Sequence, residues 1–453
     1  SGKKKWKPIM PPGSALAVEG FTLKAAELME LEVECTIWDE HVLGLIQRDD
    51  MRDYDLCLIT YLSPARFGAY RVAMVAKAAK VKTIAGGIDV TGMTRSLEGN
   101  TELLLHFDTV FVGHLTVASW RGVLTDWLAD ELQQVYHANE GELYEFVHVN
   151  LGSIDLTKYF IPGVQSSAGC LYGSCGGWCA VWLITGLTKV YCNDIGLLRK
   201  QLEELVAQGV TFFFDVSDCF GATPEDNPGF YTEQVLPLYR EFYEKYDLTW
   251  GAEISVRYLG GDDGESGLMQ QMHGSGCRFI YIGVESLKVG FAKNDPMLVK
   301  RVIERCRQLR IPILISFILD CDPEATAESV RADLKQLLRW GGQLFQLTLT
   351  VLVPGTSKRA QAIKKGRLLT YDPQTYDGLT ATLEHAAKPE ERARWLSDGW
   401  KQVYGLWNIL RLLCWVSLHQ PALLPIIWTA ARRICTGARI WRANKLNRPS
   451  SDR

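Results

Sequence analysis

Residues 163–179 read GVQSSAGCLYGSCGGWC, a short strand pattern that runs into a glycine-rich loop with three cysteines. Cys170, Cys175 and Cys179 follow a C-x4-C-x3-C spacing. Three thiolates on one loop can hold three irons of a 4Fe–4S cluster and leave the fourth iron open, and the glycines let the backbone wrap around the cluster. The loop therefore predicts an iron–sulfur site at the end of a strand.

A zinc site completed by Cys192 or Cys219 is the first alternative for these thiols, and unrelated free thiols are the second. Structural zinc usually takes four ligands from paired C-x2–4-C knuckles. Here the triplet stands alone and no fourth ligand is well spaced. The pattern therefore favours the iron–sulfur cluster.

The residues after the loop alternate strand and helix patterns. Strand-like segments lie at 211–219, 248–258, 278–286, 312–320 and 345–355, with helical segments such as 194–209 and 295–310 between them. Together with the strand before the loop they predict a full or partial β/α barrel over residues 151–357. Chemistry in a barrel sits at the carboxyl ends of the strands. The polar residues expected there are Asp215, Asp218, Ser255, Arg257, Glu285 and Asp320.

The first 150 residues predict an α/β domain with a doubly wound parallel sheet. Its expected strands lie at 6–10, 33–40, 55–62, 81–88 and 109–115, and residues 89–94 are expected to form a loop. Such a sheet binds ligands beyond the carboxyl ends of its strands. No G-x-G-x-x-G follows the first strand, which disfavours a dinucleotide. Candidate ligand-binding residues at the strand ends are Ser14, Ser63, Gly86, Gly87, Thr91, Gly113 and Thr116.

A second short motif, DEHVLG at residues 39–44, fits the D-x-H-x-x-G pattern by which some corrinoid domains ligate cobalt through histidine. In that pattern the histidine loop follows the first strand of the domain, whereas this one follows the second expected strand. Short motifs need the right structural context. We therefore interpret His41 as a solvated histidine and the match as a coincidence.

Residues 358–453 predict an aromatic-rich helical region. Residues 412–430 are uncharged, but His419, Gln420, Pro421 and Pro425 interrupt them, which argues against a transmembrane helix. The expected roles are a cover for the barrel or an apolar substrate lid. Contact with a membrane surface is the less favoured alternative, although the basic residues after Arg432 would suit anionic headgroups.

The whole chain has 453 residues, 47% of them hydrophobic, and a formal net charge of −3. The length allows two or three domains, and the charge gives no reason to expect nucleic acid as a partner. The sequence does not open on a signal-peptide pattern, so we expect a cytoplasmic protein. In a reducing compartment, clustered cysteines are more often metal ligands or catalytic groups than disulfides.

The order of these parts resembles the cobalamin-binding radical SAM family over about residues 6–357. AGGIDVT (85–91) and VFVGH (110–114) are similar to the family's cobalamin-domain loops, and IPGVQSSAGC (161–170) is similar to the start of its cluster loop. YIGVESL (281–287) and VPGT (353–356) resemble later barrel motifs. Two departures stand out. The family spacing is C-x3-C-x2-C, one residue shorter in each gap, and His114 stands where the family often has Glu.

The resemblance implies that Cys170, Cys175 and Cys179 ligate the cluster and that the open iron chelates S-adenosylmethionine. Trp178 would pack near the adenine, and Asp215 and Asp218 would meet the methionyl ammonium, with capping of the strand end as an equal alternative. Ser255 and Arg257 would face the ribose or the carboxylate, and Glu285 would help to close the site. Arg66, in the expected loop after the strand at 55–62, would lie beneath the corrin ring, with an ordinary surface arginine as its alternative.

The activity that the resemblance implies is cobalamin-dependent radical methyl transfer from S-adenosylmethionine to an unactivated carbon of a small-molecule or peptide substrate. A flavodoxin- or ferredoxin-type donor would supply electrons. Two alternatives stay open. The first is a cyclisation or rearrangement with the same cofactors, and the second is a non-catalytic corrinoid- or zinc-binding protein.

Overall fold

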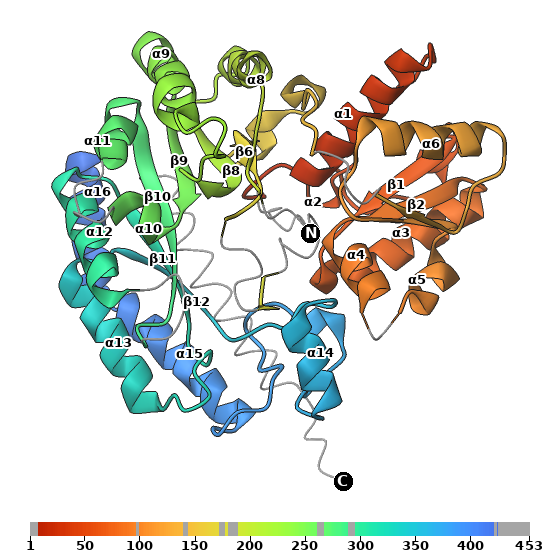
Figure 1. The fold of residues 1–453 in the computed structure, drawn as a ribbon. Helices are drawn as coiled ribbons and strands as arrows, with labels where there is room; N and C mark the ends of the chain where they lie inside the picture. Colours follow the sequence, from red (N-terminus) through yellow and green to blue (C-terminus); the bar gives the residue numbers. More distant parts are fainter. Residues whose placement is uncertain are drawn as a thin grey trace, which may run out of the picture.

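The computed structural model contains two parallel β-sheets with helices packed around them, the N-terminal sheet on the right of Figure 1 and the larger sheet on the left. The residues that the structure describes are 8–96, 99–138, 144–171, 177–179, 189–260, 267–288, 295–420 and Leu424.

The N-terminal sheet has four described strands in the order β1-β2-β3-β4, all parallel. The strands are β1 (Leu56–Thr60), β2 (Lys82–Gly86), β3 (Thr109–Val112) and β4 (Val135–His137). The helices are α1 (Gly13–Leu28), α2 (Glu40–Leu43), α3 (Arg66–Ala79), α4 (Ile88–Arg95), α5 (Thr101–His106) and α6 (Val117–Leu128). Helices α3, α4 and α5 cover one face of the sheet, and α1 and α6 cover the other (Figure 1).

The alternation of buried side chains explains the two faces. Ala85 and Val110 pack against α3, α4 and α5, whereas Ile84 and Phe111, one position away on the same strands, pack against α1 and α6. A strand buried on both faces has no polar side, and β3 is buried at every position. The expected parallel sheet with helices on both faces is therefore confirmed.

Several details of the N-terminal prediction were wrong. Residues 8–10 form no strand, and residues 33–40 pair with no sheet and end in α2. No side chain between 31 and 40 is fully buried, so this segment has no core face to place in a parallel sheet. Residues 89–94 form most of α4 instead of a loop. The described strands follow chain order, without the reversal of a doubly wound sheet.

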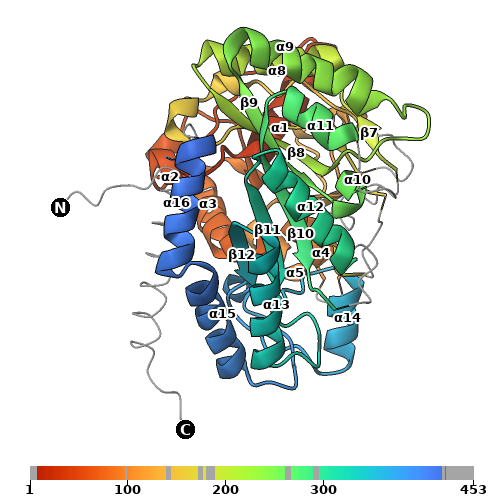
Figure 2. The same ribbon diagram turned by 90° about the vertical axis from the view of Figure 1, so that its left-hand side faces the viewer.

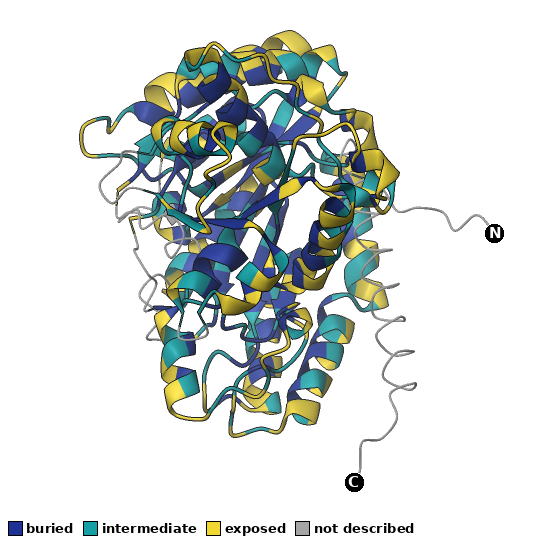
Figure 3. Cartoon of the chain, turned by 90° about the vertical axis from the view of Figure 1, so that its right-hand side faces the viewer, coloured by how far each residue is buried: buried dark blue, intermediate teal, exposed yellow. Residues whose placement is uncertain are grey.

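The larger sheet confirms the partial barrel. Its six described strands are all parallel, in the order β12-β11-β10-β9-β8-β5. They are β5 (Gly163–Val164), β8 (Phe212–Phe220), β9 (Thr249–Ile254), β10 (Cys277–Glu285), β11 (Ile313–Ile318) and β12 (Leu344–Thr348). The helices beside them are α8 (Ile195–Ala207), α9 (Leu236–Tyr246), α10 (Val256–Gly260), α11 (Gly267–Gly274), α12 (Pro296–Gln308), α13 (Ala327–Trp340) and α14 (Ser357–Lys364). The buried strands and the exposed outer faces of the helices are visible in Figure 3.

Two further helices follow, α15 (Pro389–Val403) and α16 (Leu406–His419) (Figure 2). Leu412 and Val416 of α16 pack on Phe212 and Leu344, the first residues of β8 and β12. Helix α16 therefore covers the amino ends of the barrel strands, as a core cover would. It is not a lid, because a lid would lie at the carboxyl ends. Within the described part of the chain, no helix combines the length and the apolar character that a membrane crossing requires.

Candidate functional site

The carboxyl ends of the two sheets are joined by Tyr144. Its ring lies 5.7 Å from that of His114, which follows β3, and 6.0 Å from that of Tyr191 in β7 (Tyr191–Cys192), beside the cysteine loop. Gln165 donates a hydrogen bond to the Tyr144 hydroxyl. Burial and the nearby Asp218 carboxylate raise the pKa of Tyr144 to about 12. One side chain thus connects the strand ends of both sheets.

The two sheets also meet at a second place. Gly92 of α4 packs so closely on the Pro354 carbonyl that a Cβ at position 92 would overlap it. The turn η2 (Ser63–Ala65), after β1, packs against η7 (Pro373–Thr375). Contacts on both sides therefore hold the carboxyl ends of the N-terminal sheet against those of the barrel.

Strand β8 holds the start of the cysteine loop. The short strand β6 (Ser167–Ala168) pairs with β7 and leads directly into the loop. The Ser167 amide donates to the Ser217 hydroxyl at 2.8 Å, and the Gly169 amide donates to the Asp218 carboxylate at 2.7 Å. Burial raises the pKa of Asp218, and the hydrogen bond from Gly169 lowers it in part. Asp218 lies near the end of β8 and therefore fixes the backbone beside Cys170.

Asp215 lies deeper and is completely buried. Its carboxylate accepts from the Tyr239 hydroxyl at 2.7 Å and from the hydroxyl and amide of Ser217 at 2.6 and 3.0 Å. The Ser166 amide makes a longer contact of 3.4 Å. Because these protein donors surround the carboxylate, the strand-end alternative fits Asp215 better than contact with a methionyl ammonium. Burial raises the pKa of the carboxyl.

Two of the three loop cysteines, Cys170 and Cys179, lie in the described part of the chain, and Cys175 lies outside it. Both described thiols are partly buried. No group of three metal-ligating side chains is assembled among the described residues. Cys170 and Cys179, which flank Cys175 in the sequence, are thiol donors of the kind that an iron–sulfur cluster takes.

The two cysteines proposed as fourth zinc ligands lie in different places. Cys192 pairs with Ser167 across β6 and β7. Cys219, at the end of β8, is buried and makes a hydrogen bond with Cys170. This contact and burial raise the pKa of the Cys219 thiol far above its usual range.

The last residues of the cysteine loop pack against the start of α14. Gly177 has a φ of 88° and lies so close to Ser357 that a side chain at 177 would overlap it. The Lys358 ammonium lies 5.5 Å from the centre of the Trp178 ring. Trp178 lies within the loop and the Lys358 ammonium lies over its ring, and its expected contact with adenine stays a prediction.

The remaining barrel candidates lie at strand ends. Ser255 follows β9, and its hydroxyl accepts a long hydrogen bond of 3.4 Å from the amide of Arg257, which is exposed in α10. Glu285 ends β10 at a bulge, with a φ of 62°. Of the six described non-glycine residues with positive φ, the other five follow helix ends, so Glu285 alone is strained within a strand.

Arg66 is the first residue of α3, not a loop residue, and it is only 3% exposed. Its guanidinium binds the buried Asp89 carboxylate through two hydrogen bonds of 2.7 and 2.9 Å, and Ser63 donates to the same carboxylate at 2.5 Å. The expectation of a surface arginine was therefore wrong. The Asp89 carboxylate holds the cation in place at the carboxyl end of β1.

The other N-terminal candidates divide into two groups. Thr91 and Thr116 are buried, and their hydroxyls serve the fold: Thr91 accepts from the Gly113 amide at 2.9 Å, and Thr116 caps α6. Gly86, Gly87 and Gly113 do lie at the ends of β2 and β3. Ser14 is exposed in the first turn of α1, because the strand expected before it does not form.

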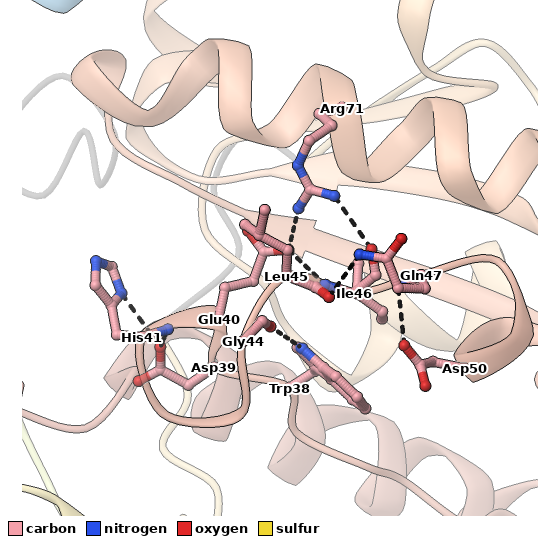
Figure 4. A network of polar contacts seen from close by, with 10 residues as sticks. All are labelled: Trp38, Asp39, Glu40, His41, Gly44, Leu45, Ile46, Gln47, Asp50 and Arg71. Atoms are coloured by element: carbon pink, nitrogen blue, oxygen red, sulfur yellow. Dashed lines mark hydrogen bonds and ion pairs between the residues drawn. The ribbon is translucent and has the colours of Figure 1, made fainter. Parts of the chain in front are cut away.

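His41 is highly exposed in α2, and its ring contacts only the Asp39 carboxylate, at 3.3 Å, among the contacts that Figure 4 draws. The rest of this segment is fastened to the fold. Glu40 forms an ion pair with Arg71 of α3, and Asp39 accepts a hydrogen bond from Tyr159 at 3.0 Å. The segment precedes β1, and no strand precedes it from residue 8 onward, which agrees with the interpretation of the motif as a coincidence.

Comparisons with known proteins show which folds and sequences this chain is similar to. No protein-family model matches the sequence. The chain is 24% identical to bacteriochlorophyllide d C-12(1)-methyltransferase of Chlorobaculum tepidum over 401 residues, 83% of this chain and 81% of that protein.

Among solved structures, the chain is similar to the radical S-adenosylmethionine methyltransferase TsrM of Kitasatospora setae with cobalamin and a 4Fe–4S cluster bound. The TM-score is 0.61 at 14% identity, over 89% of this chain and 88% of that one. A second TsrM structure, with tryptophan substrate and the SAM analogue aza-SAM, gives a TM-score of 0.57 at 14% identity over 88% and 83% of the two chains. The fold is thus similar to that of a cobalamin-binding radical SAM methyltransferase, which is the fold that the sequence resemblance implies.

Sequence reasoning missed two residues of this site, Tyr144 and Asp89, and it named Cys219 only as a candidate zinc ligand. Asp89 lies within the AGGIDVT motif, and that motif was the available signal. Tyr144 had no such signal, because its ring partners His114 and Tyr191 are distant in the sequence.

Proposed function

We propose that this chain is a cobalamin-dependent radical SAM methyltransferase that transfers a methyl group to an unactivated carbon of an apolar, aromatic small molecule. The main support is the junction at Tyr144, which joins the end of β3 to β7, the strand that pairs with β6 at the start of the cysteine loop. In this proposal residues 1–150 bind the corrinoid, residues 151–357 bind the cluster, and residues 358–453 complete the barrel.

Cys170, Cys175 and Cys179 would hold the cluster. When bound, the cluster and S-adenosylmethionine supply radical chemistry, and cobalamin supplies the methyl carrier. The chain's own contribution is to hold the loop: Ser217 and Asp218 fix the amides of Ser167 and Gly169. Trp178, Ser255, Arg257 and Glu285 would contact S-adenosylmethionine.

The corrinoid would lie at the carboxyl ends of β1 to β3. Gly86, Gly87 and Gly113 offer backbone without side chains there, and Arg66 places a fixed positive charge at the end of β1. Arg66 would then lie beside the bound corrinoid, which supplies the methyl-carrier chemistry. The two hydrogen bonds to the Asp89 carboxylate hold the guanidinium of Arg66 in one orientation. The negative charge of Asp89 also offsets part of the positive charge of the arginine.

The substrate class rests on the relatives. One acts on bacteriochlorophyllide d and the other binds tryptophan, both aromatic ring systems. An electron donor of the flavodoxin or ferredoxin type and a cytoplasmic location complete the proposal.

The test is methyl transfer by anaerobically purified protein reconstituted with iron, sulfide and cobalamin. With S-adenosylmethionine labelled in its methyl group, we expect label on the corrinoid and then on an aromatic acceptor. Cys175→Ala should abolish transfer to the acceptor, whereas Cys414→Ala, which removes an exposed thiol of α16, should not. Label that never reaches the corrinoid would refute the proposal, and turnover without label in the product would favour a rearrangement.

A further inference from the structure

Helix α16 is apolar on two opposite sides. On its inner side, Leu412 and Val416 pack on the amino ends of β8 and β12. On its outer side, Trp407, Leu410 and Leu418 are 77%, 42% and 78% exposed. A helix that is apolar all round is normally covered on both sides. Within the part of the chain that the structure describes, the outer side of α16 therefore lacks the cover that its composition requires.

The exposed side chains form one continuous face. Positions 407, 410, 411, 414 and 418 follow the three- and four-residue spacing that places side chains on one side of a helix. We call Trp407, Leu410, Arg411, Cys414 and Leu418 the outer face of α16, and all five are exposed. The helix lies at the edge of the molecule (Figure 2), so this face is open to a partner.

The chain after α16 returns to the barrel at Leu424. This residue packs with Leu412 and Val416 in the cluster at the amino ends of the strands. The contact places Leu424 on the inner side of α16, opposite the outer face.

The charge of this region favours an anionic partner. Residues 399–451 contain eight Lys and Arg and no Asp or Glu, in a chain whose net charge is −3. Arg411 lies within the outer face itself. Two copies packed through this face would bring like charges together, whereas an anionic surface would supply the opposite charge. Trp and Leu beside basic residues are typical of helices that bind in the headgroup region of a membrane.

We propose that the outer face of α16 binds the surface of a membrane that contains anionic lipids. Trp407, Leu410 and Leu418 insert among the headgroups, and Arg411 lies against the lipid phosphates. The contact stays at the surface, since no described helix is suited to cross a membrane. Because α16 lies at the amino ends of the barrel strands, the carboxyl ends with the cysteine loop stay free of the membrane. This inference goes beyond the proposed methyl transfer and does not depend on it.

The test is flotation of the anaerobically reconstituted full-length protein with vesicles of phosphatidylcholine that contain about 30% phosphatidylglycerol. We expect binding at about 0.05 M salt, weaker binding at about 0.5 M salt, and weak binding to vesicles of phosphatidylcholine alone. The triple variant Trp407→Gln, Leu410→Gln, Leu418→Gln keeps good helix formers and should bind at least about tenfold more weakly. Arg411→Gln alone should weaken binding about fivefold.

The matched control is the triple variant Met74→Gln, Leu105→Gln, Leu128→Gln. It removes three exposed apolar side chains from α3, α5 and α6, away from α16, and should bind as the wild type does. Circular dichroism should show that all variants are folded.

Four outcomes would overturn the inference. The first is a wild-type protein that binds no anionic vesicles, as expected if another part of the chain covers the outer face. The second is equal binding by the wild type and the α16 triple variant, and the third is equal binding to vesicles with and without phosphatidylglycerol. The fourth is a wild-type dimer without vesicles that the triple variant dissolves, because a second copy would then occupy the face. All four are read without methyl transfer, so they are separate from the test of the proposed function.

Discussion

At the scale of single residues, the polar groups beneath the cysteine loop are structural. Tyr239 donates to the completely buried Asp215, which also holds Ser217, and Ser217 in turn holds the loop at Ser167. A buried carboxylate that loses a hydrogen-bond donor still bears the free-energy cost of leaving water, and fewer hydrogen bonds then offset that cost.

Tyr239→Phe should therefore lower the free energy of unfolding by about 1–3 kcal/mol. Tyr54→Phe, at an exposed tyrosine, should change it by less than about 0.5 kcal/mol. Urea unfolding of both variants measures the difference. Equal stabilities would mean that the hydroxyl of Tyr239 contributes nothing to the network.

Asp333 gives the fold a pH dependence. It lines a cavity of about 230 Å³ at the ends of β10 and β11, and burial with the nearby Asp322 raises its pKa to about 6. Between about pH 4 and pH 6 the folded chain holds a proton that the unfolded chain has released, so this residue lowers stability as pH rises.

Asp333→Asn should remove this cost. A rise of about two units in the pKa of Asp333 corresponds to a stability cost of about 2.7 kcal/mol, and the partial exposure of the side chain reduces this cost. At pH 7.5 the variant should therefore be more stable than the wild type by about 1 kcal/mol. Below pH 4 the two proteins should be equally stable. Urea unfolding at both pH values tests this, and a difference that is the same at pH 4 and pH 7.5 would contradict it.

At the scale of elements, α15 is fastened to the barrel by a buried ion pair. Arg392 contacts Asp320, after β11, at 2.7 Å, with both side chains 1% exposed, and it also donates to the Leu383 carbonyl. Arg392→Met leaves Asp320 buried without its cation, so we expect a loss of about 3–5 kcal/mol in urea unfolding.

The control is Arg199→Met, which breaks the exposed bidentate pair between α8 and Glu241 of α9. Solvent screens this pair, so the loss should stay below about 1 kcal/mol. Comparable losses for the two variants would show that burial does not decide the strength of these ion pairs.

Among the elements, the buried strands of the barrel are the ones that the sequence predicts well. The barrel strands are apolar runs such as ILISFI at 313–318, because a parallel strand is buried on both faces. The segment at 33–40 also contains three β-branched residues, yet it lies on the surface beside α3. Propensity alone could not separate the two, since burial is set by neighbours distant in the sequence. For the same reason the loop cysteines were identifiable from their spacing and Tyr144, whose ring partners are distant in the sequence, was not.

At the scale of the whole molecule, Gly92 allows the two sheets to approach each other at Pro354. Gly92→Ala places a methyl group in this contact, and we expect unfolding to become easier by about 1–3 kcal/mol. Gly122→Ala adds the same methyl group in α6, where nothing lies within 4 Å, and should stabilise by about 0.5–1 kcal/mol. If Gly92→Ala is as stable as Gly122→Ala in urea unfolding, the contact does not hold the sheets together.

The central claim is that one chain brings an iron–sulfur loop and a corrinoid site together at the facing strand ends. The most direct measurement is metal analysis of anaerobically reconstituted protein, wild type and Cys175→Ala. We predict about four irons and one cobalt per wild-type chain. Cys175→Ala should lose iron but keep cobalt. Cobalt without iron in the wild type, or full iron in Cys175→Ala, would contradict it.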